Sequence, residues 1–154
     1  MNSFVFKYFY LIVLSFFILI TFNSCSDDDP ITPAKDHFEA EGMIITESGI
    51  TVASIFRGVT ADTIEVPAGG RTSGFDVNFY DENQNIIGPP DDGKILTWEI
   101  ADTTILAVWQ HPGEEGGFEL HLDGKATGIT HIEFFLMHEG HSDFRSGKIP
   151  VNVQ

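Results

Sequence analysis

The chain has 154 residues, and its 23 acidic against 8 basic residues give a formal net charge of −15. Such an acidic surface repels nucleic acid and anionic lipid headgroups, so we expect no nucleic-acid partner. One cysteine excludes an internal disulfide, and the length allows one domain with its own core.

The N-terminal segment has the features of a bacterial secretory signal peptide. Lys7 is its one charged residue, and a long apolar run follows. Cys25 follows the end of this run at Phe22 after two residues, and residues 22–25 resemble a lipobox, the sequence at which a lipoprotein precursor is cleaved and acylated. We therefore predict a signal peptide over residues 1–24 and lipidation of Cys25. The alternative is an uncleaved membrane anchor, because residues 4–22 are nearly long enough to span a bilayer.

Residues 25–37 are predicted to be the lipidated cysteine and a flexible acidic tether. The segment contains two prolines, no aromatic residue and no periodicity that buries a face. Ser26 with three aspartates resembles the acidic export tag of Bacteroidota surface lipoproteins, which implies an outer-membrane lipoprotein that faces the cell surface. The alternative is an ordinary solvated run of charge. The folded domain is expected over residues 38–154.

From residue 38 onward, short β-branched and aromatic runs alternate with turn residues, which predicts an all-β sandwich. The segment 43–56 is expected to form a hairpin with Gly49 in its turn. Pro150 has no N–H for a ladder, so the last strand is expected at a sheet edge. Five side chains are expected to be buried together: Phe75, Phe79, Trp98, Ile132 and Phe134. The expected strands after the hairpin are 63–66, 75–79, 95–100, 105–110, 118–122, 132–136 and 148–153.

Three motifs in this region match one known family: a core tryptophan strand, an aspartate turn with the strand after it, and a paired-glycine turn. In this chain they are Leu96-Thr97-Trp98, Asp102 with Ile105, Leu106 and Val108, and Gly124 to Gly128. On these residues, the segment 64–153 resembles the bacterial immunoglobulin-like domains of group 2, which occur in surface adhesins of the invasin and intimin type. The resemblance implies an immunoglobulin-like sandwich of about seven strands, to which the 43–56 hairpin is an addition. It also implies a binding or accessory role, with an envelope protein or a glycan as the partner.

One local spacing predicts a metal site, because His138, His141 and Asp143 place two imidazoles beside a carboxylate. Zinc and copper accept such ligands, and Met137 offers a thioether for copper. In the immunoglobulin strand order, the loops at 81–94, 111–117 and 138–147 share one pole, which brings His111 to the same end. A zinc- or copper-binding lipoprotein is therefore the alternative function. Histidines that occur by chance in polar loops are the competing interpretation.

The remaining chemistry-bearing side chains are expected on outer sheet faces. His121 and His131 are expected on solvated faces of opposite sheets. Trp109 and Phe135 are expected to face outward as a surface for a partner or a glycan, or to be covered by the 43–56 hairpin. The sequence contains no nucleophile elbow, phosphate loop or metalloprotease motif, so we predict a non-catalytic module.

Overall fold

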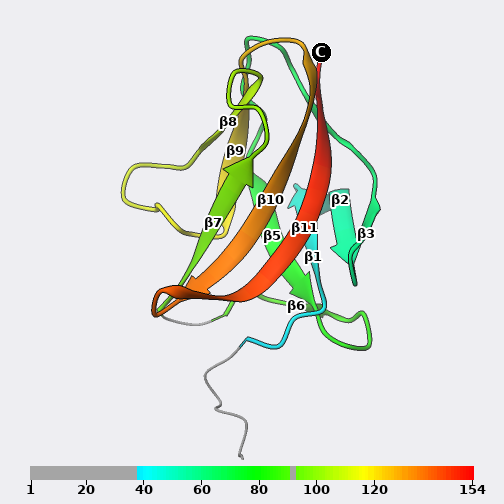
Figure 1. The fold of residues 1–154 in the computed structure, drawn as a ribbon, viewed down its shortest axis with the longest axis vertical. Helices are drawn as coiled ribbons and strands as arrows, with labels where there is room; N and C mark the ends of the chain where they lie inside the picture. The colour runs from blue at the N-terminus through cyan, green and yellow to red at the C-terminus, as the bar shows by residue number, and fades with distance from the viewer. Residues whose placement is uncertain (1–37, 91–92) are drawn as a thin grey trace, which may run out of the picture. The chain divides into compact units, whose positions relative to one another are not determined.

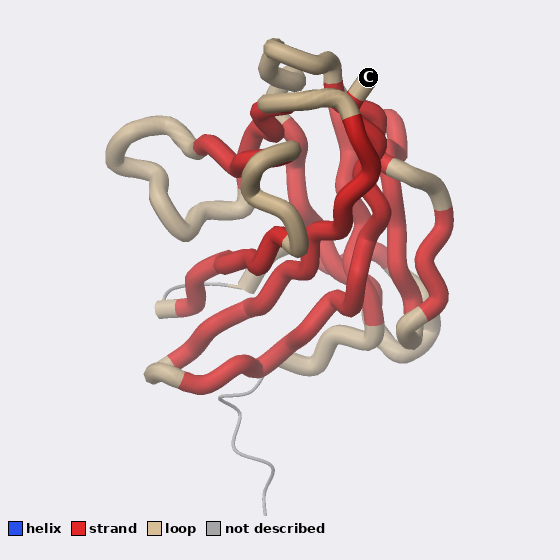
Figure 2. Tube along the Cα trace, turned by 45° about the horizontal axis from the view of Figure 1, so that its top comes forward, coloured by secondary structure: helices blue, strands red, loops and turns tan. Residues whose placement is uncertain are grey.

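The computed structural model describes residues 38–90 and 93–154, so the predicted signal peptide, Cys25 and the tether lie outside the described residues. The described part is all-β, and no helix in it is long and apolar enough to cross a membrane (Figures 1 and 2). Its eleven strands are β1 (Gly42–Glu47), β2 (Ile50–Phe56), β3 (Val59–Ala61), β4 (Ile64–Val66), β5 (Phe75–Tyr80), β6 (Ile86–Ile87), β7 (Lys94–Ile100), β8 (Leu106–Trp109), β9 (Glu119–Gly124), β10 (Gly128–His138) and β11 (His141–Val153).

The strands form two sheets that face each other as a sandwich. One sheet has the order β3-β2-β1-β5-β9-β8, with β6 added to β5, and the other has the order β4-β11-β10-β7. In an immunoglobulin domain, the second, fifth and fourth strands form part of one sheet, and the third, sixth and seventh form the other. β5, β9 and β8 occupy the first set of positions and β7, β10 and β11 the second. The predicted immunoglobulin-like sandwich is therefore confirmed.

The N-terminal hairpin is an integral part of the larger sheet. Its turn is Ser48-Gly49, with φ values of 50° and 81°, and positive φ at both central residues is the geometry that two-residue hairpin turns require. β1 pairs with β5 over its whole length. It takes the place beside β5 that the first strand of an immunoglobulin domain usually has, and β4 instead pairs in parallel with β11 in the other sheet.

The core lies between the sheets and is built from alternating strand positions. Phe75, Val77 and Phe79 point inward from β5, as their period of two predicts. Ile132 and Phe134 are fully buried opposite them, and Trp98 is partly buried at the margin of the same cluster. The ring of Phe79 lies at the centre, with Phe38, Phe118 and Phe144 edge-on at centroid distances of 4.9, 6.0 and 5.4 Å.

Two details of the last strand differ from the sequence-based expectation. β11 begins at His141, so the expected loop at 138–147 is mostly strand. β11 is also not an edge strand, because it pairs with β10 on one side and with β4 on the other. Pro150 is tolerated because the pairing with β4 begins one residue later, at Val151. At Pro150 the strand has a paired neighbour, β10, on one side only, so the missing N–H of the proline leaves no ladder hydrogen bond unmade on the other side.

We expect Phe79→Ala to lower the free energy of unfolding by about 3–5 kcal/mol, because it removes a fully buried ring between the sheets. Chemical denaturation followed by circular dichroism measures this loss. The matched control is Ile129→Ala, at a side chain that is 70% exposed, where a change within about 0.5 kcal/mol is expected. A loss below about 1 kcal/mol in Phe79→Ala would contradict the packing.

Candidate functional site

The structure places His138 and His141 opposite each other across the β10–β11 turn. The turn residues are Glu139 and Gly140, with φ values of 47° and 86°, so a two-residue hairpin turn makes the histidines a cross-strand pair. Their ring centroids are 5.8 Å apart. With Asp143, their ligand atoms lie within 4.8 Å of one another.

Asp143 in this cluster is already surrounded by cationic and histidine side chains. Its side chain is fully buried, His141 Nε2 lies 3.0 Å from Oδ1, and Lys94 Nζ lies 3.4 Å from Oδ2. His138 Nδ1 is 3.8 Å from the same Oδ2. An ammonium group beside the carboxylate compensates its charge and opposes the entry of a metal cation. The geometry therefore favours an internal ion-pair network at the β10–β11 turn.

The structure does not bring the other two predicted ligands into this cluster. Met137 precedes His138 in β10 and lies opposite Ile95 of β7. His111 follows β8 and belongs to a second cluster, in which its ligand atom lies within 4.8 Å of those of Glu119 and His121. His111 thus leaves the expected pole, because the loop after β8 folds back towards β9.

The second cluster is built by the pairing of β8 with β9. Trp109, at the end of β8, lies opposite His121 of β9. The indole ring contacts both imidazoles edge-on, at centroid distances of 4.5 Å to His111 and 5.1 Å to His121. The two imidazoles are 5.3 Å apart. His121 was expected on a solvated face, but it is half-buried, whereas His131 on β10 is exposed as expected.

Sequence reasoning missed this cluster because it depends on strand register. His111 and His121 are ten residues apart and belong to no short motif. The i, i+2 spacing of Glu119 and His121 was the available signal, since it puts both side chains on one face of a strand. Figures 1 and 2 show the loop that carries His111 projecting from the side of the sandwich between β8 and β9.

The outward-facing aromatic residues are each covered by an arginine. The guanidinium carbon of Arg71 lies 4.0 Å from the Trp109 ring centroid, and Arg71 also makes hydrogen bonds of 2.6 and 2.9 Å to both carboxylate oxygens of Asp123. This guanidinium holds the pKa of the Asp123 carboxyl below its usual range. The 43–56 hairpin therefore does not provide the cover for Trp109. It lies in the same sheet, on the far side of β5.

Phe135, which lies on β10 in the other sheet, is also covered by an arginine, Arg145 of the neighbouring strand β11. The Arg145 guanidinium carbon lies 5.5 Å from the Phe135 ring centroid. Its Nε and Nη2 donate hydrogen bonds of 2.5 and 2.9 Å to Glu133, whose side chain is almost fully buried. These bonds lower the pKa of the Glu133 carboxyl. Phe135 therefore lies beneath a surface ion pair and is not a bare aromatic surface.

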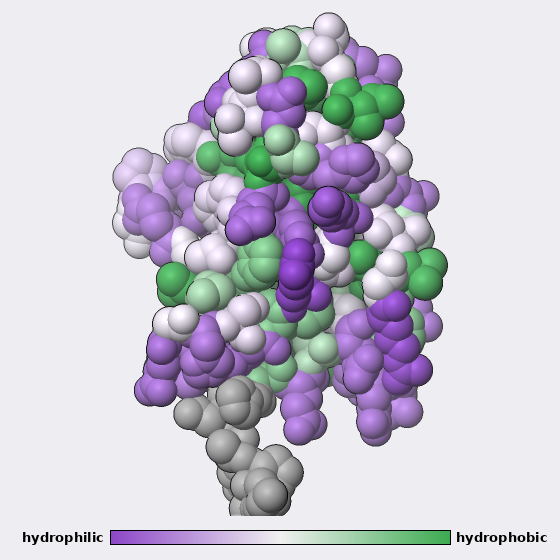
Figure 3. Space-filling model, in the orientation of Figure 1, coloured by the Kyte–Doolittle hydropathy of each residue, from purple (hydrophilic) through white to green (hydrophobic). Residues whose placement is uncertain are grey.

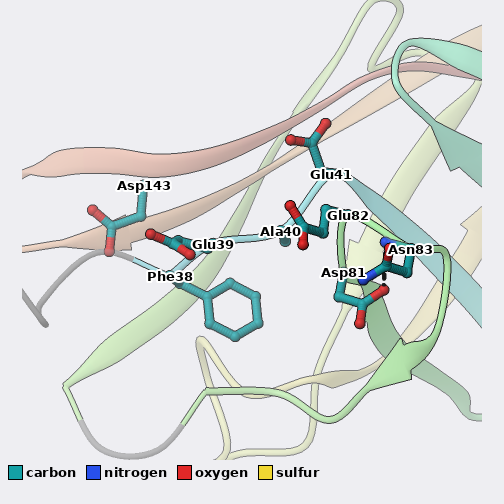
Figure 4. A pocket seen from close by; sticks show the side chains of 8 residues that line it. All are labelled: Phe38, Glu39, Ala40, Glu41, Asp81, Glu82, Asn83 and Asp143. Carbon is teal, nitrogen blue, oxygen red and sulfur yellow. Dashed lines mark hydrogen bonds between the residues drawn. The ribbon is translucent and has the colours of Figure 1, made fainter. Parts of the chain in front are cut away.

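An acidic depression lies where the chain enters the sandwich (Figure 4). Glu39 and Asp143 lie at one end of it, and Asp81 and Glu82 lie at the other. The Asp81 carboxylate accepts hydrogen bonds from the side-chain amide of Asn85 and from two backbone N–H groups of its own loop, and these bonds lower its pKa. Asp81 therefore shapes a turn, and among the described residues of the depression no further feature points to a ligand.

An apolar groove runs between the exposed edges of the two sheets, where β7 and β8 end them. Ile95, Trp98, Val108 and Trp109 line it. Ile95 is 49% exposed there. On the face shown in Figure 3, apolar side chains occur in small separate groups among hydrophilic ones.

Comparison with known proteins gives only remote likenesses. No protein-family model matches the chain, and no curated protein matches it in sequence. Among solved structures, domains 4 and 5 of the S-layer protein SbsC are similar at a TM-score of 0.42 and 18% identity, over 66% of this chain and 55% of that one. Domains 4–9 of the same protein are similar at a TM-score of 0.43 and 18% identity, over 78% and 22%. The chain thus spans about half, and about a fifth, of these two structures.

We expect Arg145→Gln to destabilise the protein at neutral pH, because it leaves the nearly buried Glu133 carboxylate without its guanidinium partner. The folded pKa of Glu133 is lowered, so the pair stabilises the fold above the usual glutamate range. That contribution is lost as the pH falls through the lowered pKa. The difference in thermal midpoint between wild type and Arg145→Gln should therefore shrink below about pH 4.

The matched control for this pair is Arg57→Gln. Arg57 forms one ion-pair contact of 3.2 Å with Glu41 and donates a hydrogen bond of 3.1 Å to the carbonyl of Glu82, and the Arg57 and Glu41 side chains are about half exposed. Exposed ion pairs contribute little, so this variant should melt near the wild-type temperature. A loss in Arg145→Gln that is equal at pH 7 and pH 3 would show that Glu133 does not carry the effect.

Proposed function

We propose that this protein is a lipid-anchored module of the bacterial cell envelope that acts by binding and not by catalysis. The observation that carries the proposal is Cys25, the one cysteine of the chain, which stands at the end of an apolar segment and 13 residues before the first described residue of the sandwich. A thiol at that junction is the attachment point of a lipoprotein. The acidic residues after it support placement at the outer membrane, with the domain facing outward.

The lipid anchor has a clear energetic basis. One acyl chain gives only marginal, reversible membrane binding, whereas two anchoring signals give stable attachment. A diacylglycerol thioether on Cys25 together with an amide-linked chain on its amino group exceeds that requirement. Because the chain carries a net charge of −15, attraction to anionic lipid contributes nothing, and the acyl chains must hold the protein.

The binding role is supported by the kind of domain that follows the tether. Residues 64–153 resemble immunoglobulin-like modules of surface adhesins, and the resemblance includes Leu96-Thr97-Trp98 and the paired glycines Gly124 and Gly128. Such sandwiches act through their loops and sheet faces. We infer an envelope protein or a glycan as the partner.

Cys25→Ala is expected to abolish lipidation and cleavage. The precursor should keep its apolar run and migrate more slowly than the mature protein, and radiolabelled palmitate should no longer be incorporated. Ser24→Ala is the matched control, because it keeps a small residue before the cysteine and should be processed normally. Unchanged labelling and membrane fractionation in Cys25→Ala would refute the anchor.

The binding role is tested by photo-crosslinking in intact cells. A benzoyl-phenylalanine placed at Ile50, Ile95 or Ile129 samples three exposed apolar positions on β2, β7 and β10. A binding module should give a discrete crosslinked product from at least one of these positions, with a position that gives none as the internal control. The absence of any product from all three positions would contradict the proposal.

A further inference from the structure

We propose that His111, Glu119 and His121 form a binding site for a divalent transition-metal ion, zinc(II) or copper(II). The site goes beyond the proposed binding module and is independent of the lipid anchor. Two imidazoles and one carboxylate offer ligand atoms that lie within 4.8 Å of one another. Nitrogen and carboxylate ligands of this kind suit zinc and copper, and three protein ligands leave a coordination position for water or another group.

The hydrogen bonding of His121 fixes which of its nitrogens can bind a metal. Its Nδ1 lies 3.0 Å from the carbonyl oxygen of Thr72, so Nδ1 carries the proton and donates it. Nε2 then presents a lone pair. This Nε2 is buried and has no hydrogen-bond partner among the described residues. A backbone carbonyl that orients the far nitrogen is a common partner of metal-bound histidine.

Thr72 is itself held against β9, which makes this orientation rigid. Its N–H donates to the carbonyl of Leu122 at 3.0 Å, and its hydroxyl accepts a hydrogen bond from the Leu122 N–H at 3.0 Å. The carbonyl that orients His121 is thus attached to the strand that carries His121. A fixed imidazole reduces the entropy that is lost when a metal ion binds.

The loop that carries His111 is also held in shape before any ligand arrives. The side-chain amide of Gln110 donates to the carbonyls of Gly117 and Glu119, and its oxygen accepts from the Gly116 N–H. Three bonds of 2.8 to 3.0 Å therefore close the loop at its base. His111 precedes a proline, which restricts its backbone to extended conformations.

The charges around this cluster favour a cation more than those at the β10–β11 turn. Arg71 lies over the ring of Trp109, with its guanidinium carbon 4.0 Å from the ring centroid, and is paired in bidentate fashion with Asp123. Asp143 of the other cluster instead has the Lys94 ammonium beside it. The carboxylate of Glu119 is exposed, so its burial in the protein adds little desolvation free energy to the cost of binding an ion.

The geometry requires a small contraction when the ion binds. Tetrahedral zinc with bonds of about 2.0–2.1 Å places its ligand atoms about 3.3–3.4 Å apart. His111 and Glu119 are exposed and can rotate towards the half-buried His121. The ion thus binds Nε2 of His121, whose position is fixed, and the side chains of His111 and Glu119 then rotate to complete its coordination.

The test is calorimetric titration of the full chain, purified in detergent without a polyhistidine tag, with zinc(II). One equivalent should bind per chain. His111→Ala and His121→Ala should each weaken binding by about tenfold or more, and Glu119→Gln should weaken it in the same direction. His111 is exposed on a loop, so His111→Ala keeps the fold intact even where His121→Ala disturbs β9.

The matched control is the double variant His138→Ala with His141→Ala, which should bind zinc with wild-type affinity. Copper(II) quenching of tryptophan fluorescence gives a second readout. The ring centroids of Trp109 and His111 are 4.5 Å apart, and the variant Trp98→Phe leaves Trp109 as the one tryptophan of the chain. No zinc binding by wild type, or binding that survives His111→Ala with His121→Ala, would overturn the proposal. Binding that is lost only in the His138/His141 variant would also overturn it.

Discussion

The packing of the two sheets around Phe79 is the interaction on which the rest of the structure depends. A chain with one cysteine has no internal disulfide, so burial of apolar surface must supply its stability. Phe79 contacts the entry segment through Phe38, the strand β11 through Phe144 and the loop just before β9 through Phe118. One ring thus links both sheets and the first residues of the domain.

Local patterns predicted most of the fold, because they report directly on burial and turns. The alternation of Phe75, Val77 and Phe79 and the turn at Gly49 are properties of a few neighbouring residues. The path of β4 was not predictable in this way, since its parallel pairing with β11 joins residues far apart in the sequence. The need for glycine at position 124 was likewise not predictable from the sequence, because it comes from a distant contact: a Cβ there would lie 2.3 Å from the carbonyl oxygen of Pro67. The sequence shows the glycine but not the backbone that approaches it.

The candidate sites follow the same division between local and distant contacts. The spacing of His138 and His141 was visible because a two-residue turn brings them together. The electrostatics of the group could not be predicted from that spacing, since Lys94 reaches Asp143 from β7, which lies on the other side of β10. Conversely, His111 and His121 meet only through the register of β8 with β9 and the fold of the intervening loop. A metal site judged from spacing alone therefore selects a different pair of histidines from one judged from geometry.

The charges around the second histidine cluster depend on where a strongly acidic chain places its few cations. Arg71 pairs with Asp123, and its guanidinium carbon lies 4.0 Å from the Trp109 ring centroid, so a single side chain contacts a carboxylate and an indole at the edge of the sheet. The indole in turn contacts both His111 and His121. The positive charge of Arg71 is thereby balanced by a carboxylate. The exposed carboxylate of Glu119 and the overall charge of −15 add a general attraction for a cation at the two imidazoles.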